Sequence, residues 1–154
     1  MNILVSACLL GVSCRYDGRD NYCDLLDRLK GRHHLIPVCP ESYGGLPIPR
    51  EPSEIRGERV VSRSGENVTS QFHRGAEALM RLAEYFDCEF AVLKERSPSC
   101  GAGQIYDGSF SKKLTAGDGI FAGMLKSKGI QVIGESEIDF YFDKDGNLRE
   151  KREE

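Results

Sequence analysis

Three cysteines occupy equivalent positions relative to short apolar segments of the chain. Residues 2–7, 34–38 and 89–93 have the length and composition of buried strands, and they are followed by Cys8, Cys39 and Cys100. Gly or Pro lies near each cysteine, which ends regular structure and permits a tight turn. The carboxyl ends of parallel strands share one edge of a sheet, where ligands bind. We therefore expect three thiols from distant parts of the sequence to meet at one site.

Three thiolates can bind either of two kinds of metal centre. They can hold a zinc ion with one open coordination position, or an iron–sulfur cluster with one iron free for substrate. The chain has no C-x-x-C pair, which disfavours a zinc ribbon or a thioredoxin-like redox pair. A buried cysteine can also be an ordinary core residue. The equivalent placement of all three thiols favours a site, and the residue types leave zinc and iron–sulfur both open.

The other three cysteines are weaker candidates. Cys14 is either a fourth ligand or a spare thiol. Cys23 is expected to open a helix, and Cys88 is expected to lie in the core at a junction between a helix and a strand. None of the three histidines has metal-motif spacing, so we interpret them as surface or packing residues. The predicted metal ligands are therefore cysteines.

Two side chains that can transfer protons stand beside these thiols. Glu41 is two residues past Cys39, and Ser97 is three residues before Cys100. A carboxylate and a hydroxyl beside anionic sulfur are suited to moving protons near neutrality. The alternative is that Glu41 is an exposed loop acid and that Ser97 only bonds the backbone of its turn. Four cations are available to offset negative charge at such a site: Arg15, Arg50, Lys94 and Arg96.

The segments between the cysteines predict an α/β fold. Apolar spacing predicts helices over 24–32, 69–86 and 119–128 and a fourth strand over 130–133. Helices that alternate with strands indicate a parallel sheet. We therefore predict a single-domain, Rossmann-like α/β sandwich around a short, mostly parallel sheet, with the site at the carboxyl ends of the strands.

Two less regular segments complete the prediction. Residues 42–66 contain many Gly and Pro, so we expect an ordered loop that walls the site, with a small hairpin at 59–62. Asn67 or Thr69 is predicted to cap the long helix that follows this loop. The charged tail from about residue 143 is expected to be a solvated edge.

Length and charge limit the class of protein. The 154 residues suit one domain, 1–154, with one core. The net charge of −3, with both signs interspersed, argues against nucleic-acid binding and gives no sign of membrane contact. The N-terminus has no basic segment and too short an apolar run for a signal peptide. We expect a cytoplasmic protein whose cysteines stay reduced.

Five motifs in the chain resemble those of the thiouracil desulfidase family. They surround the three cysteines, and the resemblance as a whole covers nearly the whole chain, to about residue 135. They are long and specific, unlike a single Gly-rich motif. In order they are SACLLG at 6–11, RYDG at 15–18, PVCPE at 37–41, SPSCG at 97–101 and IYDG at 105–108.

The resemblance implies a cofactor and an activity. It implies a [4Fe-4S] cluster held by Cys8, Cys39 and Cys100, with the fourth iron open to the sulfur of a thiolated pyrimidine. It also implies that Glu41 and Ser97 are catalytic. The reaction would be a non-redox desulfidation that gives the oxo base and sulfide. Phe121 stands where the family has a small hydroxyl residue, and we expect it to reshape the substrate pocket.

Two alternative functions remain open at this point. One is a zinc-dependent or thiol-dependent hydrolase, and the other is a non-catalytic module that binds an iron–sulfur cluster or a small ligand. The choice among thiolated bases, nucleosides and RNA also stays open, although the mildly acidic composition favours a small free thiopyrimidine over intact tRNA. The sequence does not give the oligomeric state.

Overall fold

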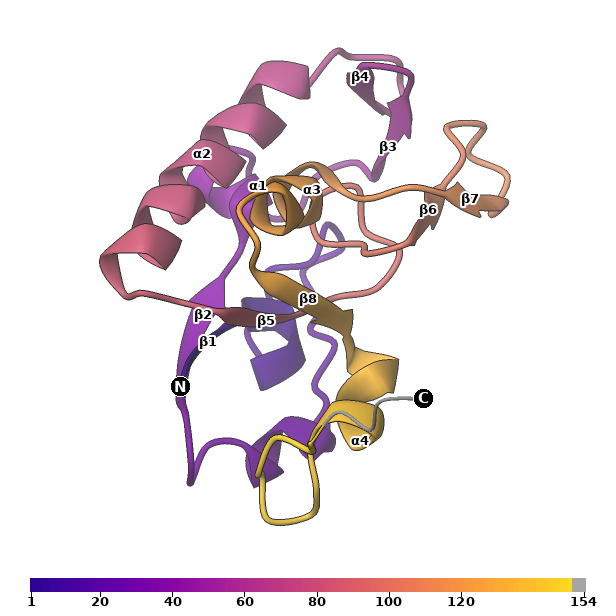
Figure 1. The fold of residues 1–154 in the computed structure, drawn as a ribbon. Coiled ribbons are helices and arrows are strands. Elements are labelled where there is room, and N and C mark those ends of the chain that lie inside the picture. The colour runs from indigo at the N-terminus through magenta and orange to yellow at the C-terminus, as the bar shows by residue number, and fades with distance from the viewer. Residues whose placement is uncertain (151–154) are drawn as a thin grey trace.

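A four-stranded parallel sheet forms the centre of the molecule (Figure 1). The computed structural model describes residues 1–150. The strands lie in the order β2-β1-β5-β8, and all three pairings are parallel. The central strands are nearly continuous apolar runs, as is typical of a parallel sheet covered on both faces. The bounds are β1 (Asn2–Ser6), β2 (His34–Val38), β5 (Phe90–Leu93) and β8 (Gln131–Gly134).

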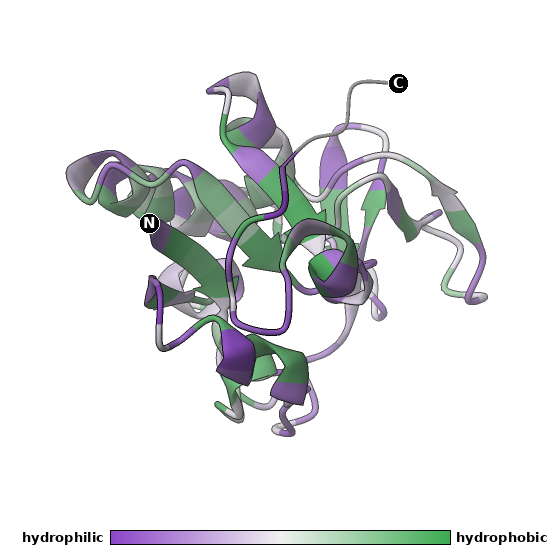
Figure 2. Ribbon diagram, turned by 60° about the horizontal axis from the view of Figure 1, so that its bottom comes forward, coloured by the Kyte–Doolittle hydropathy of each residue, from purple (hydrophilic) through white to green (hydrophobic). Residues whose placement is uncertain are grey.

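Helices cover both faces of this sheet, which confirms the predicted α/β sandwich (Figure 1). The long α2 (Thr69–Tyr85) and the shorter α3 (Ile120–Ser127) pack on one face. The other face is covered by the 3₁₀ helices η1 (Ala7–Leu10) and η2 (Asp24–Arg28) and, after η3 (Glu135–Glu137), by α4 (Ile138–Tyr141). Figure 2 shows the hydrophobic strands between more polar outer segments.

The remaining elements surround the carboxyl edge of the sheet. A short helix, α1 (Pro40–Tyr43), directly follows Cys39. The predicted hairpin is present but extends over 53–62: it pairs β3 (Ser53–Arg56) with β4 (Arg59–Ser62), and the predicted range 59–62 is only its second strand. A second hairpin pairs β6 (Gln104–Tyr106) with β7 (Leu114–Ala116). No helix among the described residues is long and apolar enough to cross a membrane.

Several local predictions need correction. The predicted helix over 24–32 is only the 3₁₀ turn η2. The N-cap of α2 is Val68, and no side chain caps the helix; instead Asn67 Oδ1 accepts a hydrogen bond of 3.1 Å from the Thr69 N–H. Phe86, the last residue of the helix predicted over 69–86, lies just beyond the end of α2 and is 39% exposed.

The tail is not only a solvated edge. Phe142 is fully buried, and the turn that follows it packs on η2. Arg32 Nε donates to the carbonyl of Asp145, and His33 Nε2 lies 2.7 Å from the carbonyl of Gly146. The last four positions of the predicted tail, 151–154, lie outside the described residues.

Phe121 does not line the substrate pocket as expected. Its side chain is fully buried in the core that α2 and α3 form against the sheet. It reaches the site only through its backbone, because its N–H donates to the carbonyl of Ser99 at 2.9 Å. The aromatic ring therefore supports the turn from inside the core.

Two glycines allow the backbones of α1 and α2 to touch. A Cβ on Gly75 would lie 1.7 Å from the carbonyl oxygen of Pro40, and a Cβ on Gly44 would lie 2.0 Å from that of Gln71. Non-bonded atoms do not approach each other so closely, so only glycine, which has no Cβ, permits this packing. The contact fixes α1, and with it the position of Cys39 and Glu41.

We expect Gly75→Ala to destabilise the protein. Replacing Gly by Ala within a helix normally stabilises it by about 1 kcal/mol, but forcing an atom into a packed site typically costs about 1–3 kcal/mol. Chemical denaturation of the cluster-free protein should show a lower free energy of unfolding. Gly31→Ala is the control, because a Cβ added at Gly31 would meet no atom within 4 Å. A Gly75→Ala protein as stable as the wild type would contradict the described packing.

Candidate active site

A cavity of about 430 Å³ opens at the carboxyl edge of the sheet. Cys8, Cys39 and Cys100 all line it. Cys8 comes from η1 immediately after β1, Cys39 lies between β2 and α1, and Cys100 lies in the turn after β5. The three strands are neighbours in the sheet, so their ends bring these residues to one place. The structure thus gathers the three predicted thiols around one hollow.

Cys14 is a fourth thiol at this site. Its side chain is buried beside Cys8 and Cys39 and lowers the pKa of both thiols, and the Cys39 thiol lies 4.0 Å from the Cys14 carbonyl oxygen. The sequence alone allows Cys14 to be a ligand or a spare thiol, and nothing in its spacing indicates this contact. By contrast, Cys88 is buried in the core as predicted, and Cys23 precedes η2. All six cysteines are free thiols.

The thiols differ in how readily they ionise. The neighbouring Cys14 thiol and, to a smaller extent, the Ser42 hydroxyl lower the pKa of Cys39 to about 6 against the effect of burial. The same Cys14 thiol lowers the pKa of Cys8. Burial raises the pKa of Cys100 to about 12. The neighbouring thiols of Cys39 and Cys8 raise the pKa of Cys14, so Cys14 holds its proton more tightly. Cys39 is thus the thiol most readily converted to the thiolate that binds metal.

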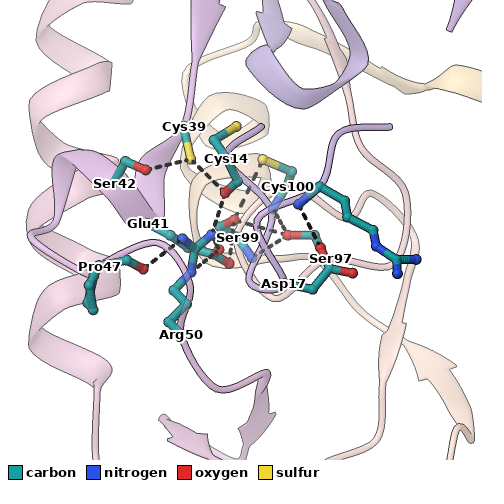
Figure 3. A network of polar contacts seen from close by, with 11 residues as sticks. Cys14, Asp17, Cys39, Glu41, Ser42, Pro47, Arg50, Ser97, Ser99 and Cys100 are labelled. Carbon is teal, nitrogen blue, oxygen red and sulfur yellow. Dashed lines mark hydrogen bonds and ion pairs between the residues drawn. The ribbon is translucent and has the colours of Figure 1, made fainter. Parts of the chain in front are cut away.

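Glu41 is held by a nearly buried arginine (Figure 3). The guanidinium of Arg50 forms an ion pair with Glu41 Oε2 through Nη2 and donates to the same oxygen from Nε at 3.1 Å. Arg50 Nη2 also donates to the carbonyl of Cys14 at 2.9 Å. The side chains of Arg50 and Glu41 are only 7% and 16% exposed. Glu41 is therefore a fixed group of the cavity wall, not an exposed loop acid.

Ser97 shapes the turn that carries Cys100. Its Oγ accepts hydrogen bonds of 3.1 Å from the N–H groups of both Ser99 and Cys100. A serine that satisfies two backbone donors in this way stabilises a turn. Ser97 also lines the cavity, and its Oγ lies 3.0 Å from Ser99 Oγ. Both roles considered from the sequence, turn bonding and access to the site, are thus compatible with its position.

Loops far apart in sequence provide the rest of the wall. The segment 42–66 contributes Arg50 and the start of β3, as predicted, and the β6–β7 hairpin contributes Tyr106 and Phe110. Of the four predicted cations, Arg50 pairs with Glu41, Lys94 pairs with Glu135 at 2.8 Å and Arg15 pairs with Asp17 at 3.2 Å. Arg96 lines the cavity from an exposed position in the turn.

The donor set fits an iron–sulfur cluster. Among residues 1–150, no three His, Cys, Asp or Glu side chains converge as the ligands of one ion do. The thiols instead line different parts of the cavity wall. In a cluster of several irons, each thiolate binds a different iron, so such spacing suits a cluster. The cavity is also large enough to admit a small molecule beside such a group.

Comparisons with known proteins agree with this site. The sequence pattern of the 2-thiouracil desulfurase family matches residues 3–137. The "Uncharacterized protein YbbK" of Bacillus subtilis (strain 168) is 40% identical over 147 residues, which cover 89% of this chain and 97% of that protein. A solved structure of the [4Fe-4S]-dependent thiouracil desulfidase TudS is 46% identical, with a TM-score of 0.84, and the match covers 90% of this chain and 93% of that one. The family pattern covers β1 to η3 and includes every residue of the cavity described above. The chain therefore belongs to the 2-thiouracil desulfurase family.

Proposed function

We propose that the protein removes sulfur from a small thiolated pyrimidine by a non-redox reaction that depends on a [4Fe-4S] cluster. One observation carries the proposal: three thiols from three adjacent strand ends line the same cavity as a fixed carboxylate and two serine hydroxyls. The reaction exchanges the sulfur of a thiocarbonyl for the oxygen of water and releases hydrogen sulfide. The carbon keeps its oxidation state, so no electron donor is needed.

The proposed cluster ligands are Cys8, Cys39 and Cys100. When bound, such a cluster supplies a Lewis-acidic iron that polarises the thiocarbonyl bond. Cys14 contacts two of these ligands but is left out of the set, because a fourth protein ligand would occupy the position that the substrate needs. The side chains around the cluster must then bind the ring, position water and move its protons.

Glu41 is the proposed proton acceptor. Arg50 binds Oε2 of this carboxylate, which leaves Oε1 turned toward the Ser97–Cys100 turn. A carboxylate fixed in this way can take a proton from the attacking water and later return it to the product. Ser97, three residues before Cys100, is the proposed hydroxyl partner in this transfer.

The cavity suits a small substrate better than a nucleic acid. Tyr106 and Phe110 provide aromatic surface for a planar ring. Binding intact tRNA would require a basic surface that neutralises several phosphates, and the chain carries a net charge of −3. We also propose that the protein acts in the cytoplasm, where its thiols would remain reduced.

Turnover by anaerobically reconstituted protein tests this function. We expect release of sulfide and of the oxo product from free thiouracils or thionucleosides, with thiolated tRNA converted much more slowly. Iron and zinc content measured on the same sample separates a cluster enzyme from a zinc-dependent hydrolase. Activity that is independent of iron would support a zinc or thiol hydrolase. A stable cluster without any turnover would support a binding module instead.

A further inference from the structure

Ser99 lies between the two proposed catalytic side chains (Figure 3). Its Oγ is 3.0 Å from Ser97 Oγ and 3.3 Å from Glu41 Oε1. The residue is only 2% exposed, so bulk water does not surround it. Ser99 thus completes a continuous chain of hydrogen bonds from Ser97 to Glu41, although the two ends are 56 residues apart in sequence.

Counting donors and acceptors gives this chain a direction. A hydroxyl has one hydrogen to donate and two lone pairs to accept with. Both lone pairs of Ser97 Oγ are used by the N–H groups of Ser99 and Cys100. Ser97 must therefore donate its hydrogen to Ser99 Oγ, since it has no lone pair left for the reverse bond.

The direction continues to the carboxylate. Glu41 is ion-paired with Arg50, and an ionised carboxylate only accepts hydrogen bonds. Ser99 therefore donates to Glu41 Oε1, which is closer to its oxygen than the Cys100 sulfur at 3.6 Å. All hydrogens in the chain point from Ser97 through Ser99 to Glu41.

This polarity prepares Ser97 to lose a proton. As its hydrogen moves toward Ser99, negative charge develops on Ser97 Oγ, and the two backbone N–H groups already directed at that oxygen stabilise it. Arg50 holds the far oxygen of Glu41, so the near oxygen stays in place to receive the proton. The arrangement favours transfer away from the cavity in the first half of the reaction.

We propose that Ser99 is a relay residue that carries protons between Ser97 and Glu41. The proposal rests on the proposed function. In the first half, Ser97 passes its hydrogen to Ser99, which passes its own to Glu41; the Ser97 oxygen, left with a free electron pair, then takes a proton from the attacking water. In the second half, the same path returns this proton from Glu41 to the departing sulfide, and the second proton of the water follows as the product carbonyl forms, so the sulfur leaves as hydrogen sulfide. Both serines end neutral, Glu41 is again a carboxylate, and no electron is gained or lost.

Ser99→Ala tests the relay, with Ser127→Ala as the matched control. Ser127 is an exposed serine at the end of α3, far in sequence from the site, and bonds only the local carbonyl of Met124. Acid–base groups typically contribute about 10²–10⁴-fold to a rate. Because water can partly replace one link, we expect kcat to fall about 10–100-fold in Ser99→Ala. Substrate Kd, KM and iron per chain should stay at the wild-type values.

A double variant separates a relay from two independent effects. If Ser97 and Ser99 act in one chain, breaking it twice should cost no more than breaking it once. The kcat of Ser97→Ala/Ser99→Ala should therefore equal that of the slower single variant. If the fall in kcat of the double variant equalled the product of the falls in the two single variants, the relay would be overturned.

Other outcomes are equally decisive. Unchanged kcat in Ser99→Ala would remove Ser99 from the reaction, whereas a loss of iron or a raised Kd in that variant would show that it only builds the site. Failure of the proposed function looks different, because the wild-type protein itself would then release no sulfide.

Discussion

Replacing Cys8, Cys39 or Cys100 by serine should each abolish the cluster and all turnover. A reconstituted wild-type chain is expected to bind about four irons, with one cysteine on each of three of them. Serine is close to cysteine in size and all three positions lie at the cavity, so the fold should survive while iron binding fails. Iron and sulfide analysis after anaerobic reconstitution, together with visible absorption, measures the effect. A variant that keeps four irons would remove its cysteine from the ligand set.

The other cysteines provide controls for this prediction. Cys23 is partly buried and Cys88 lies in the core. The Cys23→Ser and Cys88→Ala proteins should both retain the cluster. Cys14→Ser is the most informative of the series, because Cys14 lies beside two proposed ligands and lowers their pKa values without being a proposed ligand itself. We expect it to keep its iron. Equal loss of iron from Cys14→Ser would indicate a site with four cysteines, which would favour a binding or electron-transfer module over a desulfidase.

The positions of the cysteines could be predicted because one rule of sheet topology fixes them. The apolar runs before Cys8, Cys39 and Cys100 are strands, and parallel strands must present their ends at one edge. Short buried strands are recognisable from composition alone, since every residue of β5 is buried. The prediction needed no knowledge of side-chain contacts.

The partners within the site could not be predicted in the same way. Arg50 meets Glu41 only because the Gly- and Pro-rich loop after α1 folds back onto the cavity, and no periodic pattern determines such a path. Cys14 likewise lies in an irregular loop between η1 and η2. Ser99 was visible beside Ser97 in the sequence, but its role depends on which way each hydroxyl faces. Contacts between loops are set by three-dimensional packing, which one sequence does not reveal.

Phe121 illustrates a related limit. A resemblance shows that a residue differs from its family, but not which way its side chain points. The first turn of α3 bonds the turn of Ser99 through the backbone, so the backbone at position 121 lies beside the site in space while the ring enters the core. Helical periodicity would place the ring on the buried face, and that physical argument outweighs proximity to the motif.

The second large effect is expected from Glu41→Gln, which should lose most turnover and also some stability. Glutamine keeps the shape of the side chain but cannot accept a proton, so kcat should fall about 10²–10⁴-fold. The same change leaves Arg50, only 7% exposed, without its counter-ion. Breaking a buried ion pair on one side costs about 3–5 kcal/mol. Both turnover and the free energy of unfolding must therefore be measured.

A double variant tells whether the lost turnover comes from chemistry or from instability. Glu41→Gln/Arg50→Gln removes both charges, so much of the lost stability should return, because no uncompensated charge remains buried. Turnover should stay as low as in Glu41→Gln, since neither glutamine can receive the proton of the attacking water. Iron content close to that of the wild type is needed in both proteins, because Glu41 lies beside Cys39. Recovery of turnover along with stability would mean that Glu41 serves only to neutralise Arg50, and the proton acceptor would then have to be another group at the cavity.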